Sequence, residues 1–228
     1  MRLAGFTAAA LLISLPLPLS AQSPDNPQPD PASPRFDTSM LEQPWPKAKT
    51  SELEVGRYPV RWRHFASKRH GIYAGVRFDV PLGREEVWRR SNEYQDVGKT
   101  IPGVEAVRYL EQSDTHELIQ IDVKVLWKEL TLNFEIEKDP PRLMRFQLRN
   151  PSFGEYRGVC LYEERQDPAT GATTTSVDLS TWLDPARPVP LRMLLMVERM
   201  ALLQGARKFL EACDDRVKLK AAATAPAR

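Results

Sequence analysis

The alternation of apolar and polar residues predicts that most of the chain forms β-strands with one buried face. Successive side chains of a strand point to opposite sides, so a buried face needs an apolar residue at every second position. Residues 118–127 show this most clearly, because every second residue from Ile119 to Trp127 is apolar and polar residues lie between most of them. The same period predicts further strands over residues 53–65, 72–80, 130–136, 144–148, 154–163 and 173–183.

A different period, of three and four residues, predicts helices. The longest such pattern after the N-terminal apolar segment covers residues 189–213, where leucines and methionines recur mostly at these spacings. One side of this helix must therefore be buried. A shorter helix is predicted over residues 84–94, and the helix-breaking residues within 98–103 predict a turn or a short second helix.

The order of these elements is typical of an α+β fold in which one face of the sheet is covered. A strand comes first, two short helical segments follow, and a run of antiparallel strands leads to the long helix. A curved sheet must cover its apolar face, and only the last helix is long enough to do so. Because a sheet that bends around one helix tends to leave space beneath it, this order also favours an internal ligand cavity.

The two ends of the chain are predicted to lie outside this domain. Arg2 precedes an apolar run that ends near Leu15 and is followed by Ala21, as in a secretory signal peptide. The run is shorter than the roughly 20 residues of a membrane span, so we expect cleavage and export to the periplasm, with an uncleaved anchor as the alternative. The predicted organisation is a signal peptide over 1–21, a proline-rich disordered linker over 22–52, the folded domain over 53–213 and a disordered tail over 214–228.

Composition and charge restrict the partners of the protein. The 228-residue chain has a formal net charge of only +2, and its basic residues are scattered among acidic ones, so we expect no nucleic-acid partner. In an oxidising compartment, Cys160 and Cys213 could form a disulfide or remain two buried thiols. Charged residues in the last helix, among them Arg192, Glu198 and Arg199, exclude a membrane span there.

The chain shows no recognisable set of catalytic or metal-binding residues. His64, His70 and His116 form no cluster with the cysteines, which argues against a zinc site. His116 and Glu117 are adjacent in the sequence and therefore point in different directions, which argues against an acid–base pair. Because the common nucleophile, redox-cysteine and nucleotide-binding motifs are also missing, we assign no catalytic residue, no metal and no cofactor.

Four segments follow one another in an order typical of one known superfamily. They are IYAGVRFDVPLGREEVWRRSNEY, IPGVEAVRYLE, DPPRLMRFQL and WLDPARPVPLRMLLMVERM. They lie within residues 53–213 and resemble the START-like or Bet v 1-like (SRPBCC) superfamily, in particular its bacterial polyketide-cyclase and coenzyme-Q-binding-like branch. The resemblance implies a helix-grip fold, in which a curved antiparallel sheet wraps around a long C-terminal helix and encloses a hydrophobic cavity. It implies no single chemistry.

Under this resemblance, large apolar side chains facing the cavity are the candidate ligand contacts. Methionine is flexible, and aromatic rings offer broad contact area to an apolar ligand, although the same residues could instead be ordinary core. Tyr94, Tyr156 and Tyr162 could offer a hydroxyl group to the polar end of a ligand. The candidate cavity residues are Trp88, Tyr94, Val125, Trp127, Phe134, Phe146, Leu179, Met193, Met196 and Met200.

We therefore expect an exported, non-enzymatic carrier or sensor of a hydrophobic small molecule, such as a lipid, a quinone or a hopanoid-like compound. Such a protein would come close to a membrane to collect or deliver its ligand, and the sequence names no protein partner. Two alternatives use the same fold. A cyclase- or hydrolase-type enzyme would place a buried, paired acid, histidine or tyrosine in the cavity, whereas a protein-interaction module would have a filled core and an exposed apolar patch.

Overall fold

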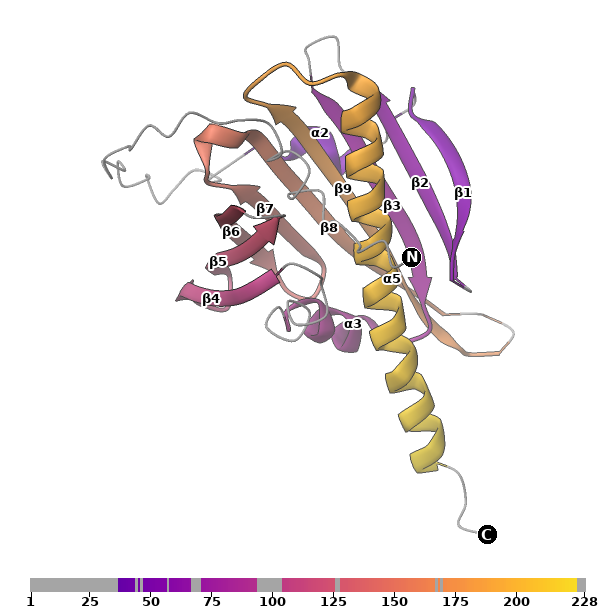
Figure 1. Ribbon diagram of the computed structural model, residues 1–228. Coiled ribbons are helices and arrows are strands. Elements are labelled where there is room, and N and C mark those ends of the chain that lie inside the picture. Colours follow the sequence, from indigo (N-terminus) through magenta and orange to yellow (C-terminus); the bar gives the residue numbers. More distant parts are fainter. Residues whose placement is uncertain are drawn as a thin grey trace, which may run out of the picture.

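A computed structural model describes residues 37–43, 45, 47–56, 58–66, 71–93, 104–125, 128–166, 168 and 170–224. Within these residues, nine strands form one antiparallel sheet in the order β1-β2-β3-β9-β8-β7-β6-β5-β4 (Figure 1). The strands are β1 (Lys49–Val55), β2 (Tyr58–Ala66), β3 (Ile72–Val80), β4 (Val104–Gln112), β5 (His116–Val125), β6 (Lys128–Asp139), β7 (Leu143–Leu148), β8 (Gly154–Gln166) and β9 (Thr173–Pro185). The helices are α2 (Ser39–Glu42), α3 (Arg84–Ser91) and α5 (Leu191–Thr224), with a short 3-10 helix η1 (Pro151–Phe153) before β8.

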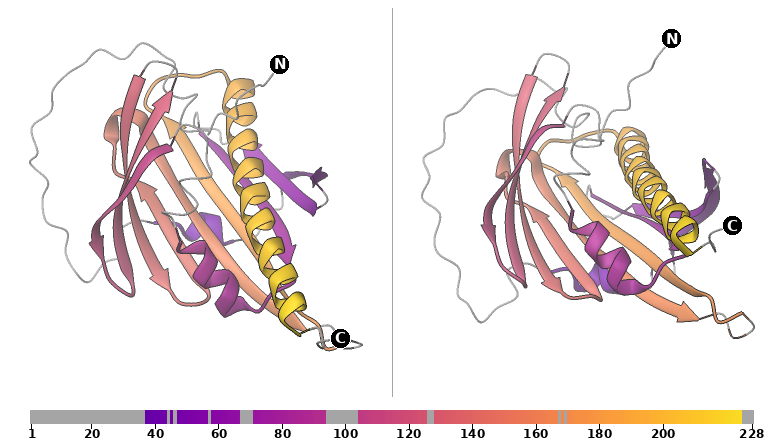
Figure 2. Two further views of the ribbon diagram at one scale, coloured as in Figure 1. Left: turned by 60° about the horizontal axis from the view of Figure 1, so that its bottom comes forward. Right: turned by 90° about the horizontal axis from the view of Figure 1, so that it is seen from below.

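The long helix α5 lies on the concave face of the sheet. Figure 2 shows β1 and β2 on one side of this helix and β4, β5 and β6 on the other. The helix packs chiefly against β3 and β2, and its Leu194, Leu202 and Leu210 are buried. Buried Glu198 and Ala206 lie between them, so the row advances in steps of four residues, and successive members share a side of the helix. The predicted α+β helix-grip fold is therefore confirmed.

Strand β3 shows how the sequence produces this arrangement. Ile72, Val76 and Val80 are fully buried on the face toward α5, whereas Arg77 and Asp79 point to the convex face of the sheet. Burying one apolar side chain of this size contributes about 1.5–3 kcal/mol, so the alternation fixes which side of the strand turns inward. The strand has the predicted bounds, and it pairs with the preceding strand β2 as an antiparallel neighbour.

The convex face carries a second apolar cluster, which the first described residues cover. Leu41 of α2 and Trp45 pack there with Leu143, Val159 and Trp182, which come from β7, β8 and β9. We refer to these five residues as the convex cluster. An ion pair of 2.8 Å between α2 and β7 supports the same contact. The N-terminal segment is thus part of the folded domain.

Ordered structure therefore begins earlier than the predicted boundary at residue 53. Helix α2 and most of β1 lie within residues 22–52, so the predicted linker is too long at its C-terminal end. The apolar surface that α2 covers is built by strands much later in the chain, and no local pattern reveals it.

Two strands, β1 and β2, also replace the single predicted segment over 53–65. Gly56 follows β1 with a φ of 68°, a left-handed conformation that glycine adopts without steric cost.

Helix α5 continues beyond its predicted end at residue 213, as far as Thr224. The prediction of a disordered tail over 214–228 is therefore wrong for 214–224. Lysine and alanine are good helix formers, and this propensity accounts for the continuation. No helix within the described residues is long and apolar enough to cross a membrane. The predicted signal peptide and the turn over residues 98–103 lie outside the described residues.

Candidate functional site

Three aromatic residues meet on the concave face, at the side of the sheet away from β1. Phe134 of β6, Phe146 of β7 and Tyr156 of β8 have ring centroids 6.0–6.4 Å apart and are all half-buried. Phe146 is aligned with Gly158 on the neighbouring strand, and a Cβ atom at Gly158 would overlap the Phe146 ring. Glycine is therefore needed there for the ring to lie against β8. We call the three rings the aromatic group.

A buried carboxyl group lies at the edge of the aromatic group. Glu198 of α5 is 0% exposed, and its Oε1 atom accepts a hydrogen bond of 2.7 Å from the Thr181 hydroxyl of β9 and one of 3.3 Å from the Tyr156 hydroxyl. The other oxygen, Oε2, is buried and has no hydrogen-bond partner among the described residues. Tyr156 therefore belongs to both sets, with its ring in the aromatic group and its hydroxyl on the carboxyl. We call Glu198, Thr181 and Tyr156 the polar cluster.

The electrostatic environment of the polar cluster disfavours negative charge. Burial raises the pKa of Glu198 to about 7, although the hydrogen bonds from Thr181 and Tyr156 partly oppose this. Burial also raises the pKa of Tyr156 well above its ordinary value, and the nearby Glu198 carboxylate adds to the increase. At neutral pH the carboxyl group is therefore present in both protonation states, and protonated Glu198 can donate a hydrogen bond as well as accept one.

A second buried carboxyl group on the concave face has a different partner. Glu117 of β5 accepts a hydrogen bond of 2.6 Å from the Lys138 ammonium group of β6, and both side chains are almost completely buried. His116, the preceding residue, instead lies 3.3 Å from Glu135. His116 and Glu117 therefore contact different groups.

Comparison with known proteins identifies the family. The family described as polyketide cyclase / dehydrase and lipid transport matches residues 80–210, which is more than half of the chain. The chain belongs to this family. The matched range includes the aromatic group and the polar cluster, but leaves out α2, β1, β2 and all of β3 except Val80. No curated protein matches the chain.

Solved structures agree with the fold of this polyketide cyclase / dehydrase and lipid transport family. The Zhui aromatase/cyclase from a Streptomyces species is 18% identical and has a TM-score of 0.53, with 65% of this chain and 96% of that chain covered. The protein TTHA0849 from Thermus thermophilus is 16% identical and has a TM-score of 0.50, with 67% of this chain and 99% of that chain covered. At this level of identity, the similarity shows the fold alone.

The structure places the predicted cavity residues of the sheet and of α3 as follows. Phe134 and Phe146 come together in the aromatic group, and Leu179 of β9 is half-buried against the main core. Trp88 of α3 contacts Tyr162 edge-on, with ring centroids 5.3 Å apart. Three further candidates cannot be placed in this way. Tyr94 and Trp127 lie outside the described residues, and Val125 is described only through its backbone.

The three candidate methionines of α5 do not share one environment. Met193 and Met200 are half-buried, but Met196 is 50% exposed. Arg192 and Arg199, four residues before and three residues after Met196, occupy the same side of the helix and are also exposed. Met196 therefore lies on the solvent side of α5, and its predicted place in the cavity wall is not supported. A methionine is apolar wherever it lies, so its residue type alone could not reveal this.

Glu198, the residue at the centre of the polar cluster, is not among the site residues predicted from the sequence, where it is only a charge that interrupts an apolar helix. A local signal was present, because Leu194 and Leu202 lie four residues to either side of Glu198 and therefore share its side of the helix. A carboxyl group within an apolar helical stripe must be buried with partners or protonated. Its partner Thr181 could not be identified without the tertiary structure.

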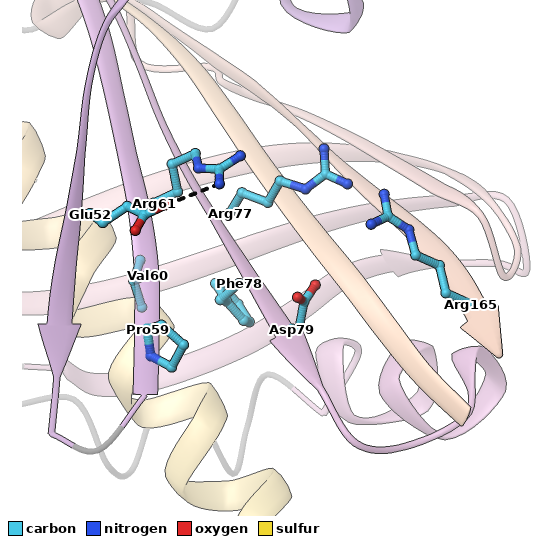
Figure 3. A pocket seen from close by; sticks show the side chains of 8 residues that line it. All are labelled: Glu52, Pro59, Val60, Arg61, Arg77, Phe78, Asp79 and Arg165. Carbon is cyan, nitrogen blue, oxygen red and sulfur yellow. Dashed lines mark hydrogen bonds and ion pairs between the residues drawn. The ribbon is translucent and has the colours of Figure 1, made fainter. Parts of the chain in front are cut away.

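A pocket of about 420 Å³ lies on the convex face. Figure 3 shows the side chains that line it. Arg61, Arg77 and Arg165 project along it, and each has an acidic partner. Arg61 pairs with Glu52 at 3.0 Å, and the other two arginines both lie 3.2 Å from Glu163. These charges are neutralised locally, and the charged lining does not suit an apolar ligand.

The apolar convex cluster is covered by the chain's own residues, so it is not the exposed patch that an interaction module requires.

The described residues contain no group of three or more histidine, cysteine or acidic side chains that could hold a metal ion. Cys160 and Cys213, the two cysteines that could have formed a disulfide, are both buried free thiols. Burial raises the pKa of each thiol to about 12, so both remain protonated at neutral pH.

Proposed function

We propose that the protein is a carrier or sensor that binds a hydrophobic small molecule on the concave face, against the aromatic group. The observation that supports this is the incomplete cover of that face. Helix α5 packs chiefly against β3 and β2, so Phe134, Phe146 and Tyr156 on β6, β7 and β8 keep part of their surface exposed. Covering such surface with an apolar ligand contributes roughly 25 cal/mol for each Å² removed from water.

The ligand class follows from the kind of surface that would be covered. The description of the family includes lipid transport as well as cyclase and dehydrase activity, which fits an apolar molecule. We propose a lipid, a quinone or a hopanoid-like compound. The signal-like segment from Arg2 to Ala21 supports export to the periplasm, where such a carrier or sensor would meet membrane-derived ligands.

Binding of the uncharged fluorescent probe N-phenyl-1-naphthylamine tests this proposal. The purified protein should bind the probe, and Phe146→Ala should weaken binding about tenfold, because one ring of the binding surface is lost. Phe65→Ala is the matched control, since Phe65 is also half-buried but stacks on Tyr73 of the convex face, with ring centroids 4.3 Å apart. Equal weakening in both variants, or no binding to the wild-type protein, would contradict the proposal.

A cyclase- or hydrolase-type enzyme is the second candidate function. The observation that favours it is the buried Glu198 carboxyl group hydrogen-bonded to Tyr156, since a raised pKa near 7 suits a proton donor or acceptor. Prolonged incubation with an extracted ligand, followed by mass spectrometry, separates the two candidates. A carrier returns the ligand with unchanged mass, whereas an enzyme converts it, and Glu198→Gln stops the conversion.

A further inference from the structure

We propose that Tyr156 is the hydrogen-bonding contact for the polar end of the bound molecule, and that Glu198 positions the hydroxyl group of Tyr156. The polar end of the molecule is then an uncharged hydroxyl or carbonyl group. The inference rests on the proposed function, because it specifies the ligand of the same site. It assigns Tyr156 to binding and Glu198 to positioning.

Burial distinguishes the roles of the members of the polar cluster. Glu198 and Thr181 are both 0% exposed, whereas Tyr156 is half-buried beside Phe134 and Phe146. A molecule lying against the aromatic group therefore contacts the Tyr156 side chain, whereas Glu198 offers it no exposed surface. This places Glu198 behind the binding surface.

The Tyr156 hydroxyl retains hydrogen-bonding capacity in this arrangement. A phenol carries one donor and two acceptor positions. When Glu198 is ionised, Tyr156 donates to it at 3.3 Å and its lone pairs remain for a ligand hydroxyl. When Glu198 is protonated, it can donate to Thr181, whose own hydroxyl lies 3.2 Å from the Ala74 carbonyl oxygen, and Tyr156 can then donate to a ligand carbonyl. Either end group thus finds a partner.

The surrounding groups explain why the polar end should be uncharged. The described residues place no ion pair on Glu198. Across the sheet from Thr181 lie the uncharged Ala74 and then His64, whose pKa is lowered, first by burial and then by the positive charges of Lys49 and Arg199. A carboxylate or phosphate at Tyr156 would therefore lie beside a second acidic group, Glu198, which forms no ion pair with a cation of the described residues.

Three ten-carbon probes that differ only in their end group, decane, 1-decanol and decanoate, test the inference. Their binding is measured by displacement of N-phenyl-1-naphthylamine at pH 8. The wild-type protein should bind 1-decanol about threefold to tenfold more tightly than decane, the range for one uncharged hydrogen bond. Decanoate should bind more weakly than 1-decanol. Tyr156→Phe should abolish the preference for 1-decanol over decane, whereas Tyr73→Phe, on the convex face, should retain it.

Two variants of Glu198 test positioning. Glu198→Gln still accepts the hydrogen bond from Tyr156 and should retain the preference for 1-decanol, whereas Glu198→Leu should lose it. An equal preference in wild type and Tyr156→Phe, or tighter binding of decanoate than of 1-decanol, would overturn the inference while leaving the proposed function intact. If none of the three probes binds the wild-type protein, the proposed function itself is wrong.

Discussion

The two buried carboxyl groups of the concave face differ in how their charge is satisfied. Glu117, between β5 and β6, lies 2.6 Å from the ammonium group of Lys138, a cation that is buried with it. Glu198, between α5 and β9, has only hydroxyl partners. In both groups the second carboxyl oxygen is buried without a partner among the described residues, so the cation is the difference between them. A buried carboxylate with a cation can remain charged, whereas one with neutral partners tends to take up a proton. The comparison therefore assigns a structural role to the first region and a titratable site to the second.

The largest expected effect comes from breaking the ion pair. Lys138→Met should reduce the free energy of unfolding by about 3–5 kcal/mol, because Glu117 would remain buried without a counter-charge. Urea denaturation followed by circular dichroism measures this change. A loss below about 1 kcal/mol would show that the pair is open to solvent and would remove the contrast with Glu198.

Titration of Glu198 should have the next largest effect. Its pKa is raised from 4.5 in the unfolded chain to about 7 in the fold, so between these values the folded state binds more protons and stability falls as pH rises. Below pH 4.5 the full stability is present, and above pH 7 the loss is complete. The unfolding free energy of the wild-type protein relative to Glu198→Gln should therefore decrease by about 3 kcal/mol between pH 4.5 and pH 8. Parallel pH profiles of the two proteins would contradict the raised pKa.

The smallest of these effects concerns the hydroxyl partner. Thr181→Val should cost about 1–2 kcal/mol at pH 8 and less at pH 5, because an ionised Glu198 needs the lost donor more than a protonated one does. Thr175→Val is the matched control, since Thr175 is a fully buried threonine of the same strand and donates instead to the Leu82 carbonyl oxygen at 2.7 Å. Its cost should not change with pH. Equal pH dependence in the two variants would argue against coupling between Thr181 and Glu198.

These regions also show which features the sequence could predict. The bounds of β3 could be predicted because its apolar residues alternate along the sequence. The same alternation predicts which of its side chains point inward, and these are the buried ones. The position of α2 does not, since the convex cluster that it covers is assembled from β7, β8 and β9. The partners of Glu198 could not be predicted for the same reason. Its partners Tyr156 and Thr181 precede it by 42 and 17 residues, and only the fold brings their hydroxyl groups to its carboxyl group.

The central claim is that the concave face holds an apolar small molecule, and native mass spectrometry of the protein purified from its own host tests it most directly. The account predicts a mass above that of the polypeptide chain alone, and loss of this excess after extraction with organic solvent. The extract should contain an apolar compound with an uncharged hydroxyl or carbonyl group. A protein that shows only the mass of its own chain and takes up no apolar probe would contradict the account.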